Sequence, residues 1–202
     1  SLTRMKTDMV DGMLMHAISE PEDADQRIAD GVYEALLKAK EQGKIRYLGF
    51  SGHFKTAANL RVLERLGDQV DLTLMPLNAV DPSDDDSFTN KVLPKLTEMG
   101  VAALAMKTAA YGNFFTEAIE IDGLESAPIV PARITIQDLY EVVLDQPISC
   151  WVCGMDKPEQ VIQNAKIARD FNGMDPARKN GIIARVAAYR NNHKLEGYRK
   201  WA

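Results

Sequence analysis

The chain has 202 residues, of which 46% are hydrophobic and 26% are charged, and this composition is typical of one soluble globular domain with a sizeable core. Its formal net charge of −5 provides no broad basic surface for nucleic acid or an anionic membrane, and no apolar run reaches the ~20 residues of a membrane helix. Cys150 and Cys153 are the only cysteines, which indicates no disulfide framework. We therefore expect a cytoplasmic protein that binds neither nucleic acid nor membrane. An upstream targeting segment stays open, because the first residues read like the interior of a longer chain.

Five short apolar segments alternate with amphipathic ones along the chain. The apolar segments predict strands at about 8–16, 45–50, 72–77, 101–106 and 148–153. The amphipathic segments predict helices over about 28–42, 55–66, 92–99, 135–144 and 157–171, with the end of a further helix at 1–7 and a basic surface helix at 175–198. Segments 20–25, 81–86 and 119–133 read as loops. This alternation predicts parallel βα units with right-handed crossovers.

The first predicted strand ends in a histidine. Its period-2 alternation places Val10, Gly12, Leu14 and His16 on one face. A strand-end histidine can reach into a ligand site, or it can be satisfied by a neighbouring group and have only a structural role. The strand pattern by itself leaves both interpretations open.

The most informative stretch is 43–53, GKIRYLGFSGH. Gly43 can end the preceding helix in the left-handed conformation, and Thr135 further along is a plausible helix N-cap. Residues 45–50 then read as a buried parallel strand bounded by glycine. Ser51 and Gly52 allow a tight turn at its carboxyl end, where parallel α/β folds place ligands.

GKIRYLGFSGH resembles the aldo-keto reductase motif in which a Gly-Lys-Ile-Arg strand ends in a Gly-x-Ser turn. The first residues, SLTRMKTDMVDGMLMH, resemble the segment of that family that carries the histidine of the catalytic tetrad, here His16. The resemblance covers essentially the whole chain and implies a (β/α)8 TIM barrel of aldo-keto reductase type. Aligned to the family, 1–202 form a single domain with only about the last five βα units, because the first three have no counterpart.

The resemblance implies NAD(P)H-dependent reduction of an aldehyde or ketone to an alcohol. The family uses a tyrosine as general acid, a lysine and an aspartate that tune it, and a histidine that orients the carbonyl. By resemblance the Asp, Tyr and Lys belong to the missing strands. His16 is therefore the catalytic residue expected here, and the chain should be inactive by itself. The missing strands would come from the same longer polypeptide or from another chain.

A nicotinamide cofactor site is implied at the carboxyl ends of the strands. Its expected residues are Ser51, Gly52, Asn78, Met106, Lys107, Gly154, Met155, Asp156, Lys157, Glu159, Gln160 and Asn164. Three positions depart from the family pattern: Gly52 replaces a frequent asparagine, Leu74 a frequent glutamine, and Gln160 the arginine that many members use against the 2′-phosphate. The choice between NAD and NADP is therefore open, and Met106 reads equally well as a core residue.

Two classes of function stay open. The first is an NAD(P)H-dependent oxidoreductase acting on a small-molecule carbonyl substrate. The second is a non-catalytic aldo-keto reductase-like protein that senses a nucleotide or binds a subunit. No metal site is expected, because the acidic segment 81–86 fits no EF-hand spacing. Cys150 and Cys153 stand three apart on a predicted strand, so their side chains should face opposite ways as buried small hydrophobes.

Overall fold

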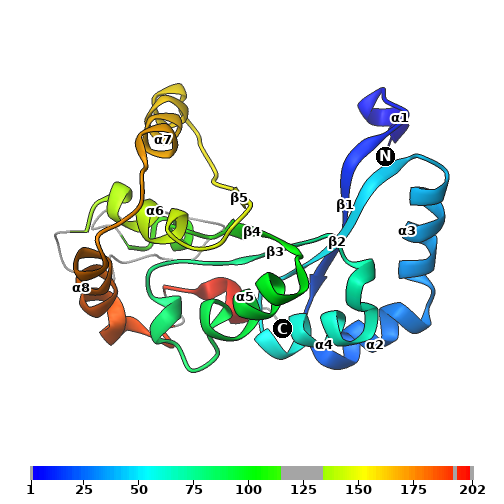
Figure 1. Ribbon diagram of the computed structural model, residues 1–202, viewed down its shortest axis with the longest axis horizontal. Coiled ribbons are helices and arrows are strands. Elements are labelled where there is room, and N and C mark those ends of the chain that lie inside the picture. The colour runs from blue at the N-terminus through cyan, green and yellow to red at the C-terminus, as the bar shows by residue number, and fades with distance from the viewer. Residues whose placement is uncertain (1, 115–133, 193–194, 201–202) are drawn as a thin grey trace.

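The computed structural model describes residues 2–114, 134–192 and 195–200. Its strands form one parallel sheet whose spatial order follows the sequence (Figure 1). They are β1 (Val10–Ile18), β2 (Ile45–Gly52), β3 (Leu72–Pro76), β4 (Ala102–Met106) and β5 (Cys150–Trp151). All five predicted strands are confirmed. Parallel strands in sequence order, each followed by a helix, are the wall of a (β/α)8 barrel.

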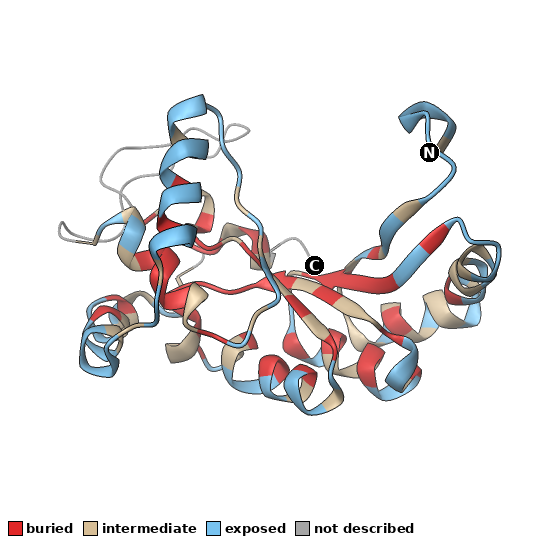
Figure 2. Cartoon of the chain, turned by 45° about the horizontal axis from the view of Figure 1, so that its top comes forward, coloured by how far each residue is buried: buried red, intermediate tan, exposed pale blue. Residues whose placement is uncertain are grey.

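The helices of the described chain follow the strands in the expected alternation. They are α1 (Leu2–Met5), α2 (Pro21–Ala29), α3 (Val32–Glu41), α4 (Thr56–Leu66), α5 (Phe88–Met99), α6 (Ile136–Leu144), α7 (Pro158–Asp170) and α8 (Pro176–Val186). Short 3-10 turns lie at Asp81–Ser83, Ala110–Gly112 and Gly197–Lys200. Figure 2 shows a row of these helices along one side of the sheet.

The segment before β2 differs from the prediction. The expected loop at 20–25 belongs to α2, which starts with Pro21 and carries Glu22 and Asp23 in its first turn, where acidic groups favour a helix start. The expected single helix 28–42 is broken, because Gly31 adopts a φ of 76° that a helix cannot contain. Two helices therefore cover this part of the sheet.

Other helix ends match the sequence signals, with one exception. Gly43 takes the left-handed conformation with a φ of 69°, and Thr135 forms a capping box with Asp138. The terminal helix predicted over 175–198 is wrong in length, since α8 ends at Val186 and gives way to a 3-10 turn. The loop predicted at 119–133 lies outside the described residues.

The two faces of the sheet have different surroundings. The helix-covered face carries side chains that are 0–2% exposed, namely Leu48, Phe50, Thr73, Met75, Ala103 and Ala105. On the alternate face Tyr47 is 47% exposed, and Leu14, Leu72 and Leu104 are half-buried. The period-2 alternation thus separates a packed outer face from an open inner face in the part of the chain that the structure describes.

The two cysteines are less buried than predicted. Cys150 pairs with Leu104 in the sheet register, which places it on the open inner face, and it is exposed. Cys153 lies beyond the short β5 and is half-buried, with its Sγ accepting a hydrogen bond of 3.3 Å from Nδ2 of Asn164. The interpretation as two buried hydrophobes is therefore wrong, because β5 ends before the second cysteine.

Across the described ranges, no helix has the length and apolar character that a membrane crossing needs.

Candidate functional site

The carboxyl ends of β1 to β4 bring several of the predicted residues to one edge of the sheet, which we call the mouth. His16 and Ser51 lie in the last residues of β1 and β2, Asn78 comes two residues after β3, and Lys107 directly follows β4. Parallel α/β sheets bind their ligands at this edge. The mouth is therefore the place to examine for chemistry.

His16 is exposed at a break in the pairing register of β1. The pairing with β2 shifts between Met15 and Ile18, and Ala17 adopts a left-handed φ of 52°. Nη1 of Arg27 on α2 donates to the carbonyl oxygen of His16 at 2.8 Å, and Asp23 fixes that arginine through a 2.6 Å contact to Nε. Bulges commonly re-aim a side chain next to a functional site. The backbone of His16 is thus held by α2 while its imidazole stays accessible.

Ser51 joins the ends of β1 and β2. Its side chain is fully buried, and its Oγ accepts a 2.8 Å hydrogen bond from the N–H of Ala17. This bond ties the irregular part of β1, where the register shifts, to the end of β2. The hydroxyl proton of Ser51 remains for a further acceptor.

His53 is a residue of the mouth that the sequence interpretation did not name. Its ring lies edge-on to His16, with the two centroids 5.9 Å apart and the planes at 69°. Burial, the Lys107 ammonium and His16 lower the pKa of His53 to about 4, so it is a neutral imidazole near neutral pH. The sequence signal that could have identified His53 as a site residue is its position at the end of the stretch GKIRYLGFSGH.

Lys107 stands in a strained turn. Nζ of Lys107 donates to the hydroxyl of Tyr111 at 2.6 Å and lies 4.1 Å from the centre of that ring. Lys107, Ala110 and Tyr111 all have positive φ, at 59°, 46° and 60°. Left-handed residues other than glycine cost free energy and concentrate at functional sites. This turn therefore holds, at a conformational cost, a cation close enough to His53 to lower the pKa of that imidazole.

Asn78 is buried with its amide fully used by the protein. Nδ2 donates to Oε1 of Glu196 at 2.9 Å and to the hydroxyl of Tyr198 at 3.0 Å, and Oδ1 accepts from the N–H groups of Val80 and Asp81. A cofactor contact by Asn78 stays a prediction, since a ligand would compete with these partners. Met106 is only 6% exposed, which fits the core role that its sequence also allowed.

The acidic segment 81–86 is not the solvated loop that the sequence predicted. Asp81 is fully buried and accepts from Ser87 Oγ, from the N–H groups of Phe88 and Thr89, and from Nη2 of Arg199. Asp84 is 8% exposed. Asp81 caps the start of α5 and receives an arginine from the far end of the chain, which explains its burial.

The remaining predicted cofactor residues gather at β5 and α7, at the opposite end of the strand order from β1. A groove of about 500 Å³ is lined by Met155, Asp156, Lys157, Pro158, Val161 and Ile162. Gly154 and Glu159 are exposed beside it. Gln160 caps α7, because its Oε1 accepts from the N–H groups of Asp156 at 2.6 Å and Lys157 at 3.1 Å. Asn164 is buried against Cys153.

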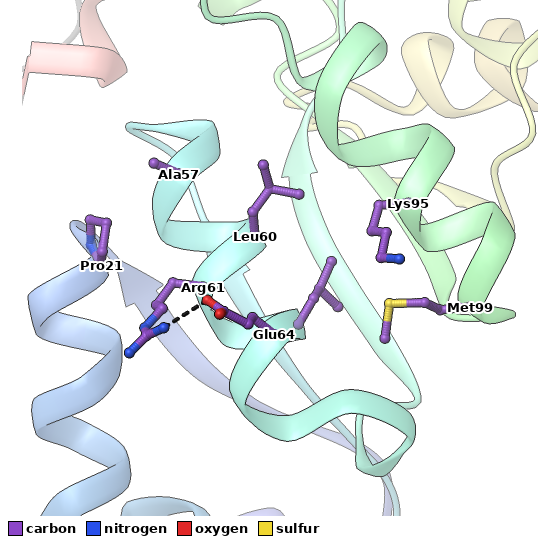
Figure 3. A pocket seen from close by; sticks show the side chains of 8 residues that line it. Pro21, Ala57, Leu60, Arg61, Glu64, Lys95 and Met99 are labelled. Carbon is purple, nitrogen blue, oxygen red and sulfur yellow. Dashed lines mark hydrogen bonds and ion pairs between the residues drawn. The ribbon is translucent and has the colours of Figure 1, made fainter.

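A larger groove lies away from the mouth, among the outer helices. It measures about 760 Å³ and is lined by Pro21, Ala57, Leu60, Arg61, Leu63, Glu64, Lys95 and Met99 (Figure 3). Arg61 and Glu64 form an ion pair of 2.7 Å at its rim. Because these residues come from α2, α4 and α5 rather than from strand ends, this groove is separate from the candidate site.

The described residues contain no group of three or more His, Cys, Asp or Glu side chains that could hold a metal ion.

Known proteins share this architecture. The family model described as Aldo/keto reductase family matches residues 1–178. An aldo-keto reductase from Bacillus halodurans in its holo form is 19% identical with a TM-score of 0.68, over 96% of this chain and 67% of that one. An aldo/keto reductase from Klebsiella pneumoniae in complex with NADP and acetate is 19% identical with a TM-score of 0.61, over 90% of this chain and 60% of that one. The glycerol dehydrogenase of Gluconobacter oxydans is 16% identical with a TM-score of 0.61, over 95% and 62%.

No curated protein matches the sequence at a significant level. This chain spans between 60% and 67% of the length of the three solved structures just named. At identities this low, the structural similarity shows a common fold and no more. The family model, which matches residues 1–178, establishes the family. The chain belongs to the aldo/keto reductase family.

Proposed function

We propose that this chain is part of an NAD(P)H-dependent oxidoreductase that reduces an aldehyde or ketone to an alcohol. The observation that carries the proposal is His16, whose imidazole is accessible at the mouth while Arg27 tethers its backbone. A fixed backbone with an open side chain suits a residue that must place one hydrogen bond accurately. In this role His16 donates to the carbonyl oxygen of the substrate and orients it.

The residues at the strand ends fit a nicotinamide cofactor, which when bound would supply the hydride. Ser51 retains a hydroxyl proton next to His16, and Lys107 offers an ammonium group at the end of β4. Lys157 lines the groove at the start of α7, where the helix dipole has its positive end. The ammonium group and the helix start both favour binding of a phosphate group. The Klebsiella pneumoniae neighbour contains NADP, which supports this class of cofactor.

Residues 1–202 are, in this proposal, one portion of a single closed barrel. The inner face of the sheet carries half-buried leucines, and α7 leaves Val161 and Ile162 49% and 70% exposed. In the part of the chain that the structure describes, β1 and β5 are the edge strands of the sheet, and natural proteins rarely leave the backbone groups of such edges uncovered. Additional strands, from the same polypeptide or another chain, would cover these surfaces. A cooperatively folded, soluble monomer of these residues alone would contradict this arrangement.

The test compares the intact protein with its His16→Ala variant. We expect kcat/KM for carbonyl reduction to fall by about a hundredfold, the usual scale for a positioned polar group in the transition state. The affinity for NADPH, measured by fluorescence titration, should stay within about twofold, because His16 is assigned to the substrate. Arg46→Ala is the control, since this exposed side chain forms only a surface ion pair with Asp11.

An unchanged kcat/KM in His16→Ala would remove this residue from the mechanism. NADPH binding by the wild type without any turnover on a panel of aldehydes and ketones would instead favour the nucleotide-sensing alternative. One observation favours this alternative: the amide of Asn78 already binds Glu196 and Tyr198, so it would contribute less to cofactor binding.

A further inference from the structure

Asn59 on α4 is an unusual residue at the mouth. Its side chain is completely buried, and across the described chain neither its Oδ1 nor its Nδ2 has a hydrogen-bond partner. A buried amide without partners loses the hydrogen bonds that it makes with water in the unfolded chain. Such a group therefore calls for a partner that the protein itself does not provide.

The amide of Asn59 lies where the side chain of residue 52 would be. A Cβ built on Gly52 would stand 1.8 Å from Oδ1 of Asn59 and 3.1 Å from its Nδ2. No residue larger than glycine fits there without moving Asn59. The end of β2 thus has an amide beside it, contributed by the next helix rather than by the strand.

Local contacts fix α4 in this position. The N–H of Thr56, the first residue of α4, donates to Oδ2 of Asp86 at 3.1 Å, and its hydroxyl donates to Oδ1 of the same carboxylate. Asn59 stands three residues into the helix and faces the turn after Ser51. The anchored start of the helix therefore fixes the backbone position from which this amide projects, while the side chain itself makes no hydrogen bond in the described chain.

We propose that Asn59 binds the carboxamide of the nicotinamide cofactor, next to Ser51. A primary carboxamide offers one acceptor oxygen and one N–H₂ donor, the complement of the unpaired Oδ1 and Nδ2 of Asn59. Because the amide is closed off from solvent, its side chain must rotate out past Gly52, which has no side chain to block it. This inference rests on the proposed function. It assigns to Asn59 of α4 a side-chain hydrogen bond to the carboxamide that Gly52, which has no side chain, cannot make.

The test replaces Asn59 by leucine, which has a similar shape and no hydrogen-bonding group. We expect the dissociation constant of NADPH to rise about tenfold or more, the loss of hydrogen bonds inside a site. The dissociation constant of ADP-ribose, which lacks the nicotinamide, should stay unchanged. The melting temperature without ligand should not fall, because the variant removes an unsatisfied buried amide.

Gln146→Leu is the matched control. Among the described residues, Gln146 is also buried with an Oε1 that has no hydrogen-bond partner. It follows α6, away from the mouth, so its loss should leave both dissociation constants unchanged. A second variant, Gly52→Asn with Asn59→Ala, returns an amide to the same space from the strand and should recover NADPH affinity to within about threefold of the wild type. This recovery does not depend on how well the leucine variant folds.

Three results would overturn the inference. Equal NADPH affinity of wild type and Asn59→Leu would show that the amide has no ligand role. Equal weakening of NADPH and ADP-ribose would show that Asn59 supports only the fold. If the wild type binds neither ligand, the proposed function fails and this inference fails with it, whereas the first two results leave that function intact.

Discussion

Arg199 connects the carboxyl-terminal segment to the mouth, and we expect its replacement to be the most destabilising single change in this region. Its Nη2 contacts Oδ1 of buried Asp81 at 2.7 Å, its Nη1 donates to the carbonyl oxygen of Asp86 at 2.9 Å, and its Nε lies 3.3 Å from Glu196. Burial by itself would lower the pKa of Arg199, but Glu196, Tyr198 and Asp81 raise it above its usual range. The arginine is therefore charged, and it compensates buried carboxylates.

The size of the effect follows from what Arg199→Met leaves behind. Removing one partner of a buried ion pair costs about 3–5 kcal/mol, because the other charge stays buried without compensation. Asp81 keeps three other donors, from Ser87, Phe88 and Thr89, so we expect the lower end of this range, about 3 kcal/mol. In the intact protein such a loss lowers the melting temperature by several degrees.

Urea unfolding followed by far-UV circular dichroism measures the free energy of unfolding. Arg190→Met is the control, because Arg190 is an exposed arginine close by in sequence, and its loss should cost less than about 0.5 kcal/mol. A double-mutant cycle with Asp81→Asn separates the pairwise interaction from the effect of losing each side chain.

A loss below about 1 kcal/mol in Arg199→Met would refute this reasoning, since that is the range of exposed ion pairs. Additive effects in the cycle would also refute it. Either result would mean that Asp81 is satisfied by the start of α5 and that the terminal segment is held by the packing of Tyr198 instead.

Two further predictions concern the mouth and the α7 groove. Because the pKa of His53 is about 4 in the folded protein and near 6.5 when unfolded, the unfolded state binds more protons between these values, so stability should fall as the pH drops from about 6.5 to about 4. His53→Phe should make this fall shallower in urea unfolding at a series of pH values, and parallel curves for the two proteins would contradict the assignment. At α7, Gln160 is already used as a helix cap, so we expect the wild type to prefer NADPH over NADH by less than about a hundredfold. Gln160→Arg should raise this preference by about tenfold or more in fluorescence titrations, because a charged contact to the 2′-phosphate is gained, and an unchanged ratio would show that Lys157 already provides it.

Local sequence determined most of the elements of this protein. Period-2 apolar segments defined the five strands, a glycine at position 43 and a threonine at 135 marked helix ends, and the motif around Ser51 identified the family. These signals extend over only a few residues, so they can be interpreted without knowing which residues pack against them in the folded protein. The break at Gly31 was visible only as a glycine, because a helix tolerates that residue unless its φ turns positive.

The contacts of the site were decided by the tertiary structure. Arg199 meets Asp81 across 118 residues of sequence, His53 meets His16 across the β1–β2 pairing, and Asn59 lies in the space left by Gly52. Each contact depends on which strand ends and helix starts the parallel topology brings together. A single sequence does not show which residues far apart in the chain become neighbours in space. Burial followed the same rule: Asp81 became a buried cap and Cys150 an exposed thiol because of what packs beside them, while their own chemistry predicted the reverse.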